Sequence, residues 1–297
     1  MTKAHAKNPL VTYPWLAIAN SVEQYVAPDY YKKLLKEYSF NGVSDLKYLE
    51  NYIKELNPAN VLELGCGSGR ATEVAFRKFS SSKFTLVDLS ERMISASKEQ
   101  FGENAAAFHT QDAVDFLKKT KQHYDFVYSL WSFSHSVHQH VHKQGFDRAG
   151  WMIERTLKTF IRNNLNKGGR FFLIHFDSMS DEQRILMRQW KKVFPEFADI
   201  HQQSPSKRII DSALLDLDNS NEIVLSIIHL RGDAITYASE DEVLETFLNF
   251  HLETYFNKTT MLASILQDVR NKIAPYRNRD GSFSIQPGCF VYAFEKC

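Results

Sequence analysis

The sequence predicts an α/β protein in which helices cover both faces of a mostly parallel, doubly wound β-sheet. From Val61 onward, short apolar runs alternate with stretches whose apolar residues recur every three or four positions. Strands separated by helices in this way pair in parallel through right-handed crossovers. The chain has 297 residues, of which 43% are hydrophobic, enough to bury both faces of such a sheet.

The elements follow in chain order. The predicted strands are 61–64, 84–88, 105–109, 124–130 and 170–176, and the predicted helices between them are 69–79, 90–101, 112–119 and 147–165. The stretch "NKGG" at 166–169 is typical of a helix stop followed by a turn. These elements place one α/β core at about residues 45–176.

Both ends of the chain extend this core. Residues 1–44 are rich in aromatic side chains and predict an N-terminal helical cap, separate from an α/β domain over 45–297. Insertions are expected at about 177–288. Helical spacing is found at 28–38, 44–56, 181–194, 239–250 and 258–273. Two strands joined around Arg231–Asp233 predict a hairpin, and a last strand lies near 289–295.

Composition narrows the function. The formal net charge is +1, which gives no electrostatic footprint for nucleic acid, and no apolar run is long enough to span a membrane. The N-terminus lacks the apolar core of an export signal, and the three cysteines are too scattered for a disulfide framework or zinc site. We therefore expect a cytoplasmic monomer or homodimer that acts on a small molecule.

A glycine-rich loop, "VLELGCGSGR" at 61–70, follows the first strand of this core. Gly65, Gly67 and Gly69 allow a tight turn and let a ligand approach the N–H groups at the start of a helix. Asp88 ends the next strand, where a carboxylate can accept hydrogen bonds from a ribose diol. A dinucleotide-binding loop needs its third glycine one residue later, where Arg70 stands, so binding of NAD is the weaker alternative.

These motifs resemble the class I S-adenosylmethionine (SAM)-dependent methyltransferase superfamily over about residues 45–176. The resemblance implies a seven-stranded sheet whose last strand, "CFVYAFE", is antiparallel. It also implies SAM as the cofactor and "QDA" at 111–113 as the adenine-binding position. The implied cofactor-binding residues are Glu63, Gly65, Cys66, Gly67, Gly69, Asp88, Leu89, Gln111, Asp112, Ala113, Ser129, Leu130 and Trp131.

Transfer of the SAM methyl group needs an aligned acceptor and, for some acceptors, a base. His135 is the candidate base, since the family's motif order puts it nearest the reacting methyl group. The candidate substrate-pocket residues are Tyr13, Trp15, Tyr30, Tyr31, Phe133 and His175. The histidines from His135 to His142 are interpreted as part of a polar loop at the pocket mouth, and no metal is predicted.

The leading hypothesis is methyl transfer to an oxygen or nitrogen of a small-molecule metabolite. One alternative is intramolecular attack within SAM, which releases methylthioadenosine and forms a small cyclic amino acid, because a fold fixes the cofactor and not the reaction. A non-catalytic SAM-binding module and an NAD-dependent oxidoreductase are further alternatives. The acceptor is not specified by these motifs.

Overall fold

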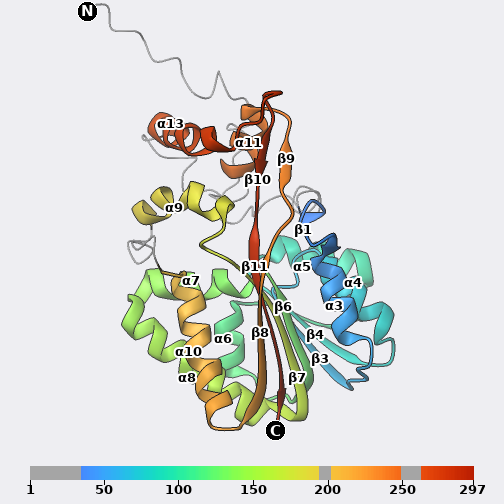
Figure 1. Cartoon of the computed structure of the whole chain (residues 1–297). Helices are drawn as coiled ribbons and strands as arrows, with labels where there is room; N and C mark the ends of the chain where they lie inside the picture. The colour runs from blue at the N-terminus through green and yellow to red at the C-terminus, as the bar shows by residue number, and fades with distance from the viewer. Residues whose placement is uncertain (1–34, 194–201, 249–261) are drawn as a thin grey trace, which may run out of the picture.

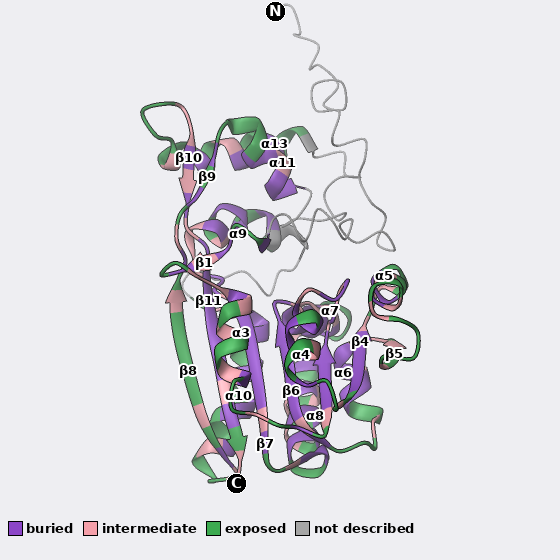
Figure 2. Cartoon of the chain, turned by 90° about the vertical axis from the view of Figure 1, so that its right-hand side faces the viewer, coloured by how far each residue is buried: buried purple, intermediate pink, exposed green. Residues whose placement is uncertain are grey.

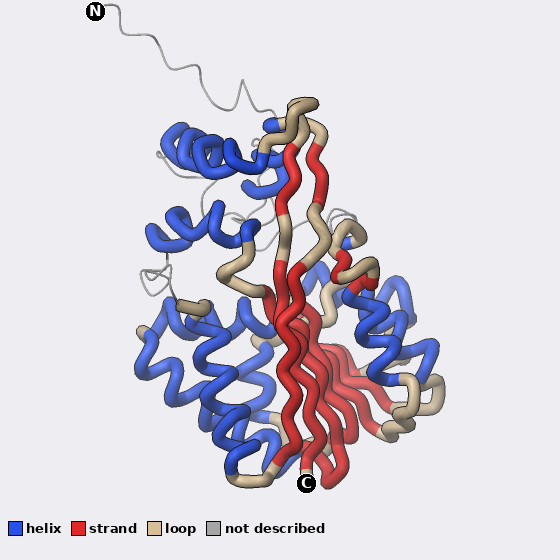
Figure 3. The backbone as a smooth tube through the Cα atoms, in the orientation of Figure 1, coloured by secondary structure: helices blue, strands red, loops and turns tan. Residues whose placement is uncertain are grey.

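The computed structural model describes residues 35–193, 202–248 and 262–297. A seven-stranded sheet with the strand order β5-β4-β3-β6-β7-β11-β8 forms its centre (Figure 3). The strands are β3 (Asn60–Leu64), β4 (Lys83–Asp88), β5 (Ala107–Thr110), β6 (Tyr124–Leu130), β7 (Leu165–Phe176), β8 (Ile223–Arg231) and β11 (Gly288–Lys296). The predicted α/β fold and each strand predicted for its core are confirmed.

The last strand is the reversed one, as predicted. β11 pairs antiparallel with both β7 and β8, while the pairs among β5, β4, β3, β6 and β7 are parallel. Tyr292 and Phe294 of β11 are buried in the core that this arrangement creates. The carboxyl ends of β3, β4 and β6 consequently meet at one edge of the sheet, where the glycine loop begins.

Helices cover the two faces of the sheet, giving three layers (Figure 1). One face carries α3 (Asp45–Ile53), α4 (Arg70–Lys78) and α5 (Glu91–Phe101), and the other carries α6 (Ala113–Lys119), α7 (Phe133–Gln144), α8 (Phe146–Asn164) and α10 (Pro205–Asn219). Burial follows the layers: the inner strands are almost wholly buried, while much of β8, at the edge of the sheet, is exposed (Figure 2).

Two of these helices were not predicted. Residues 133–144 form helix α7 rather than a polar loop, because its buried face, including Val137 and Val141, packs into the core. Helix α10 has a clear N-terminal signal that the sequence reading missed: the Ser204 side chain caps it and Pro205 occupies its first turn. Its buried residues Ile209, Ile210, Ala213, Leu214 and Leu217 have helical spacing.

The described part of the predicted helical cap contains a hairpin. β1 (Ser39–Phe40) pairs antiparallel with β2 (Val43–Ser44). Asn41 and Gly42 between them have φ values of 55° and 72°, the left-handed backbone that an Asn-Gly turn favours. The helix predicted over 44–56 is confirmed as α3, which the Ser44 side chain caps by accepting a hydrogen bond from the Lys47 N–H.

The hairpin predicted around Arg231–Asp233 is wrong. β9 (Ile235–Tyr237) pairs with β10 (Phe283–Ile285), while β8 pairs with β11, so two chain segments run from a small sheet into the large one (Figure 3). The reason lies between the sheets, where the N–H of Gly232 donates to the carbonyl of Pro287 at 2.8 Å. The chain therefore continues its pairing with the segment before β11 instead of folding back.

The expected turn at 166–169 lies inside β7. This strand follows α8 directly, and a register shift against β6 absorbs the extra residues between Leu165 and Arg170. Gly168 has a φ of 70° there. The glycines thus mark an irregularity in a strand rather than a separate turn.

A smaller lobe lies above the carboxyl ends of the strands (Figure 1). It contains α9 (Asp181–Val193), α11 (Glu240–Thr246), α13 (Leu262–Ile273), the short 3-10 helix η4 (Ala274–Tyr276), β9 and β10. The three α-helices confirm the helices predicted in these regions. α10 and β8 also fall within the predicted insertion but belong to the large sheet's own layers. Among the described helices, none has the length and apolarity that a membrane crossing requires.

Candidate functional site

The three glycines of the loop are needed for different reasons. All have left-handed backbone, with φ values of 76° at Gly65, 54° at Gly67 and 95° at Gly69. A Cβ at Gly65 would lie 1.7 Å from the Ser132 Oγ, and one at Gly69 would lie 2.3 Å from the Phe101 ring. A Cβ at Gly67 would meet nothing within 4 Å. Gly65 and Gly69 therefore permit close packing, while Gly67 faces open space.

Asp88 joins the loop to the end of β4. Its Oδ2 accepts a hydrogen bond from the Gly67 N–H at 2.8 Å, and its Oδ1 accepts one from the Ser90 N–H at 2.9 Å. Burial raises the pKa of the Asp88 carboxyl, and the backbone N–H bonds oppose that shift. The carboxylate is thus fixed at the sheet edge with an acceptor site remaining on each oxygen.

A pocket opens between this loop and α7. It holds about 970 Å³ of empty space, its open mouth included. The predicted residues that line it are Glu63, Gly65, Cys66, Gly67, Asp88, Leu89, Gln111, Asp112, Ala113, Leu130 and His135. Segments as far apart in the chain as Glu63 and His135, which are separated by 72 positions, therefore converge on one cavity, as the parallel sheet requires.

Polar groups line the wall formed by α6 and α7. Asp112 caps α6 by accepting from the Asp115 N–H at 3.1 Å, and the Ser136 hydroxyl lies 2.8 Å from each of its oxygens. Its Oδ1 is also 3.0 Å from the His140 Nε2. Burial raises the pKa of Asp112, but the bonds from His140, Ser136 and Asp115 outweigh burial and lower it overall. The Gln111 Nε2 is buried without a hydrogen-bond partner among the described residues.

Glu63 lies at the base of the pocket and is almost fully buried. Its Oε2 accepts hydrogen bonds from the Thr72 hydroxyl at 2.5 Å and the Tyr128 hydroxyl at 2.7 Å. Burial outweighs these bonds and raises the pKa of Glu63 to about 7. This side chain connects β3, α4 and β6 beneath the loop.

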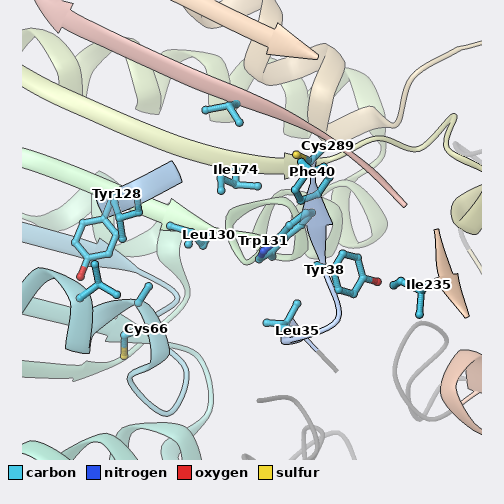
Figure 4. Packing of buried hydrophobic residues seen from close by; sticks show 14 of the residues in the cluster. Leu35, Tyr38, Phe40, Cys66, Tyr128, Leu130, Trp131, Ile174, Ile235 and Cys289 are labelled. Carbon is cyan, nitrogen blue, oxygen red and sulfur yellow. The ribbon is translucent and has the colours of Figure 1, made fainter. Parts of the chain in front are cut away.

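Trp131 does not line the pocket, contrary to the prediction. Its backbone is left-handed, with a φ of 66°, and its indole Nε1–H donates to the Asp45 Oδ2 at 2.7 Å. Its ring packs between Tyr38 and Phe40, with centroid distances of 5.6 and 6.1 Å (Figure 4). Arg70 forms an ion pair with the same Asp45 carboxylate. The tryptophan therefore joins the hairpin β1–β2 and α3 to the end of β6.

Other predicted site residues have packing roles. Ser129 is fully buried and its hydroxyl donates to the Leu64 carbonyl at 2.6 Å, so it joins β6 to β3. Phe133 is 1% exposed and lies in the core beneath the helices. Gly69 is the N-cap of α4 and is not among the pocket-lining residues.

His175 also lies away from the pocket. It is 1% exposed, and its Nε2 lies 2.8 Å from the Ser206 Oγ while its Nδ1 lies 2.6 Å from the Phe176 carbonyl oxygen. Burial lowers the pKa of His175 to about 4. The predicted substrate-pocket residues Tyr13, Trp15, Tyr30 and Tyr31 lie outside the described residues.

The histidine cluster is distributed around helix α7. His135 faces the pocket, the His138 Nε2 accepts from the Ser206 N–H at 3.3 Å, and His142 is exposed. Asp112, Asp115 and His140 have potential metal ligand atoms within 4.8 Å of one another. Because Asp112 already accepts hydrogen bonds at the start of a helix, where the dipole favours anions over cations, we assign no metal to this group.

Sequence reasoning missed five uncharged polar residues of the pocket, namely Ser68, Ser90, Ser132, Ser136 and Gln139. Three of them, Ser132, Ser136 and Gln139, belong to or directly precede α7, and with His135 they follow the i, i+3, i+4, i+7 pattern that places side chains on one helical face. Their signal was this spacing, which was hidden because 133–144 was interpreted as a loop. Arg70, noted only for taking the place of a glycine, also lines the pocket.

Comparison with known proteins finds a methyltransferase domain in the part of the chain that contains the glycine loop. Residues 61–156 match the methyltransferase domain family. A malonyl-(acyl-carrier protein) O-methyltransferase 1 of Ilyobacter polytropus is 32% identical over 75 residues, which is 25% of this chain and 27% of that protein. A malonyl-(acyl-carrier protein) O-methyltransferase of Bacillus cereus is 32% identical over 108 residues, 36% of this chain and 38% of that protein. The chain thus spans about a quarter to two fifths of the length of the curated relatives it matches.

A solved structure shares the fold. The YcgJ protein from Bacillus subtilis aligns with a TM-score of 0.51 and 13% sequence identity, covering 84% of this chain and 97% of that one. At that identity the likeness concerns the arrangement of the strands and helices.

Proposed function

We propose that this chain, whose residues 61–156 match a methyltransferase domain family, transfers the SAM methyl group to an oxygen or nitrogen of a small-molecule acceptor. One observation supports this most strongly: Gly65 and Gly67 of the loop, the three predicted carboxylates and His135 line one cavity. SAM supplies a methyl group that is already activated by its positive sulfur. The protein then has to bind the cofactor and the acceptor, align them, and accept the proton that the acceptor loses.

The residues present fit this cofactor. Gly67 leaves the space beside the loop free of side-chain atoms, and the adjacent Asp88 retains acceptor sites suited to a ribose diol. Gln111 presents a buried amide nitrogen that has no partner among the described residues, and Asp112 presents a carboxylate. An unpartnered buried donor is costly, which supports a ligand that accepts from it.

His135 is the residue we assign to the acceptor. It lies in the first turn of α7, directly beyond the end of β6, and is partly buried at the pocket wall. From this position its imidazole can orient an acceptor O–H or N–H, or take its proton. The smaller lobe above the strand ends would supply the remaining acceptor contacts (Figure 1).

The acceptor class is inferred from composition and from the relatives. The nearly balanced charge offers no general attraction to nucleic acid. The named relatives methylate an oxygen of a malonyl group on a carrier protein, but their similarity to this chain covers only part of it. We therefore propose a small-molecule acceptor, with oxygen as the first atom to test, and a cytoplasmic location where SAM is available.

The cofactor assignment is tested by calorimetric titration with S-adenosylhomocysteine (SAH). We expect binding to the unmodified protein and at least a roughly 30-fold loss for Asp88→Ala, because the variant removes the acceptors for the diol. Asp147→Ala, which replaces an exposed carboxylate on α8, is the matched control and should bind normally. Equal affinity in all three proteins would place the cofactor elsewhere.

The reaction is tested by incubating the protein with SAM alone and following the products by mass spectrometry. For a methyltransferase, SAM should persist until an acceptor is added, and SAH should then form. Methylthioadenosine released without an acceptor would contradict methyl transfer and favour cyclisation of SAM. Once an acceptor is found, His135→Asn should lower kcat at least tenfold while SAH affinity stays constant.

A further inference from the structure

We propose that Ser136 and His140 are positioning residues for the base of the cofactor: they hold the Asp112 carboxylate so that the pocket selects a 6-aminopurine over a 6-oxopurine. This inference rests on the proposed function, since it assumes that the adenine of SAM occupies this wall of the pocket. It gives a role to one of the histidines in the cluster from His135 to His142.

The two oxygens of Asp112 are unequally occupied. Oδ1 accepts from the Asp115 N–H at 3.1 Å and lies 3.0 Å from the His140 Nε2. Among the residues that the structure describes, Oδ2 has only the Ser136 hydroxyl within hydrogen-bond distance, at 2.8 Å, and Oδ1 lies equally close to that hydroxyl. Because a hydroxyl carries one proton, it can serve only one oxygen at a time. Oδ2 therefore keeps acceptor capacity for a ligand.

Ser136 is itself held in place. Its Oγ accepts a hydrogen bond from the Val114 N–H at 3.1 Å, in the first turn of α6. That bond occupies an acceptor site on the hydroxyl and leaves its proton free to point at Asp112. The serine is buried, so water does not compete with Asp112 for this hydroxyl proton.

His140 is fixed from its other side. Its Nδ1 lies 3.2 Å from the Nε2 of Gln144, one helical turn further along α7. An amide N–H that donates to Nδ1 places the imidazole proton on Nε2, from which it is donated to Asp112. A line of hydrogen bonds thus runs from Gln144 through His140 to Asp112. The His140 ring is buried, so bulk water does not compete for its hydrogen bonds.

The resulting wall has a defined polarity. Asp112 is kept as an ionised acceptor, in keeping with its lowered pKa, and the neighbouring Gln111 offers an amide donor without a partner among the described residues. The edge of adenine has the complementary pair, an exocyclic amino donor beside a ring-nitrogen acceptor. A 6-oxopurine reverses both groups, so a carbonyl oxygen would face a carboxylate and a ring N–H would face a donor.

The test compares two ligands, SAH and its deaminated analogue S-inosylhomocysteine, by calorimetric titration. For the unmodified protein we expect a preference for SAH on the order of 100-fold, since the analogue leaves buried polar groups mismatched. His140→Ala and Ser136→Ala should each weaken SAH binding about tenfold and leave the analogue's affinity unchanged. His140→Gln, which keeps a donor near the Nε2 position, should restore most of the preference.

Each other outcome overturns a distinct statement. Equal binding of both ligands by the unmodified protein would refute base selection while leaving the cofactor assignment intact. A parallel loss of both ligands in His140→Ala and Ser136→Ala would mean a general structural role instead of positioning. Binding of neither ligand would refute the proposed function, and the inference with it. His142→Ala, on the exposed side of the same helix, is the control and should bind as the unmodified protein does.

A cation at Asp112, Asp115 and His140 would explain the same contacts differently. The titrations are therefore repeated with EDTA and with added manganese(II). We expect the SAH affinity to stay within twofold. A larger change on adding manganese would assign these side chains to a metal and overturn the hydrogen-bonded arrangement.

Discussion

His175 makes the stability of the folded chain depend on pH in a measurable way. Burial of its imidazole lowers the pKa to about 4 from its ordinary value of 6.5. The unfolded chain therefore binds a proton that the folded chain does not bind between these two pH values. Stability from this residue is complete above pH 6.5 and is lost as the pH falls towards 4.

The size of the effect follows from the two pKa values. Each pH unit within this window changes the free energy of unfolding by about 1.4 kcal/mol. Lowering the pH from 7 to 5 should thus remove about 2 kcal/mol through His175 alone. His138, whose pKa burial also lowers well below its usual value, contributes in the same direction.

The assay is urea unfolding at pH 7 and pH 5 for the ligand-free protein and for His175→Gln. The variant retains an amide near Ser206 but cannot bind the extra proton on unfolding. It should lose about 2 kcal/mol less between the two pH values than the unmodified protein does. His142→Gln, at an exposed site, should lose as much as the unmodified protein. Identical losses in all three proteins would refute the burial of His175.

Three further predictions concern the pocket and its support. Glu63 makes stability depend on pH in the opposite direction to His175. Burial raises its pKa from 4.5 to about 7, so its contribution to stability falls as the pH rises through this range. The effect of Glu63→Gln on the unfolding free energy of the ligand-free protein should therefore be more stabilising at pH 8 than at pH 4, by up to about 3 kcal/mol. Gly67→Ala should abolish SAH binding measured by calorimetry and lower the free energy of unfolding by only about 1 kcal/mol. Gly65→Ala should lower the free energy of unfolding in denaturant by roughly 2–3 kcal/mol, because its Cβ would overlap Ser132. Trp131→Phe should destabilise the folded protein by about 1–3 kcal/mol, because Asp45 loses a buried hydrogen-bond donor, and should leave the SAH affinity unchanged. Weaker SAH binding by this variant would mean that Trp131 contacts the cofactor.

The sequence predicted the parts of the site that backbone geometry determines. The glycine loop and Asp88 follow successive parallel strands, and such strand ends must meet at one edge whatever side chains surround them. Periodicity likewise located the strands of the core and the helices between them, apart from α7. The position of the cavity could therefore be inferred without tertiary information.

The direction of individual side chains could not be inferred in the same way. Trp131 occupies the expected place at the end of β6, but its left-handed backbone and the buried Asp45 hold its ring among Tyr38 and Phe40. His175 is buried because Ser206 lies opposite, on a helix whose cap was missed. Such contacts join residues far apart in the chain, and no local spacing encodes them.

The placement of β11 has a consequence for how the chain reaches its native state. Its residues, 288–296, are synthesised after β7 and β8, yet they insert between these two strands and are paired on both edges. Until they emerge from the ribosome, β7 and β8 lack their shared neighbour and each exposes a row of unpaired backbone groups. The sheet is thus completed only when residues 288–296 are in place, and a chain truncated before residue 288 would leave two unpaired strand edges open to other nascent chains.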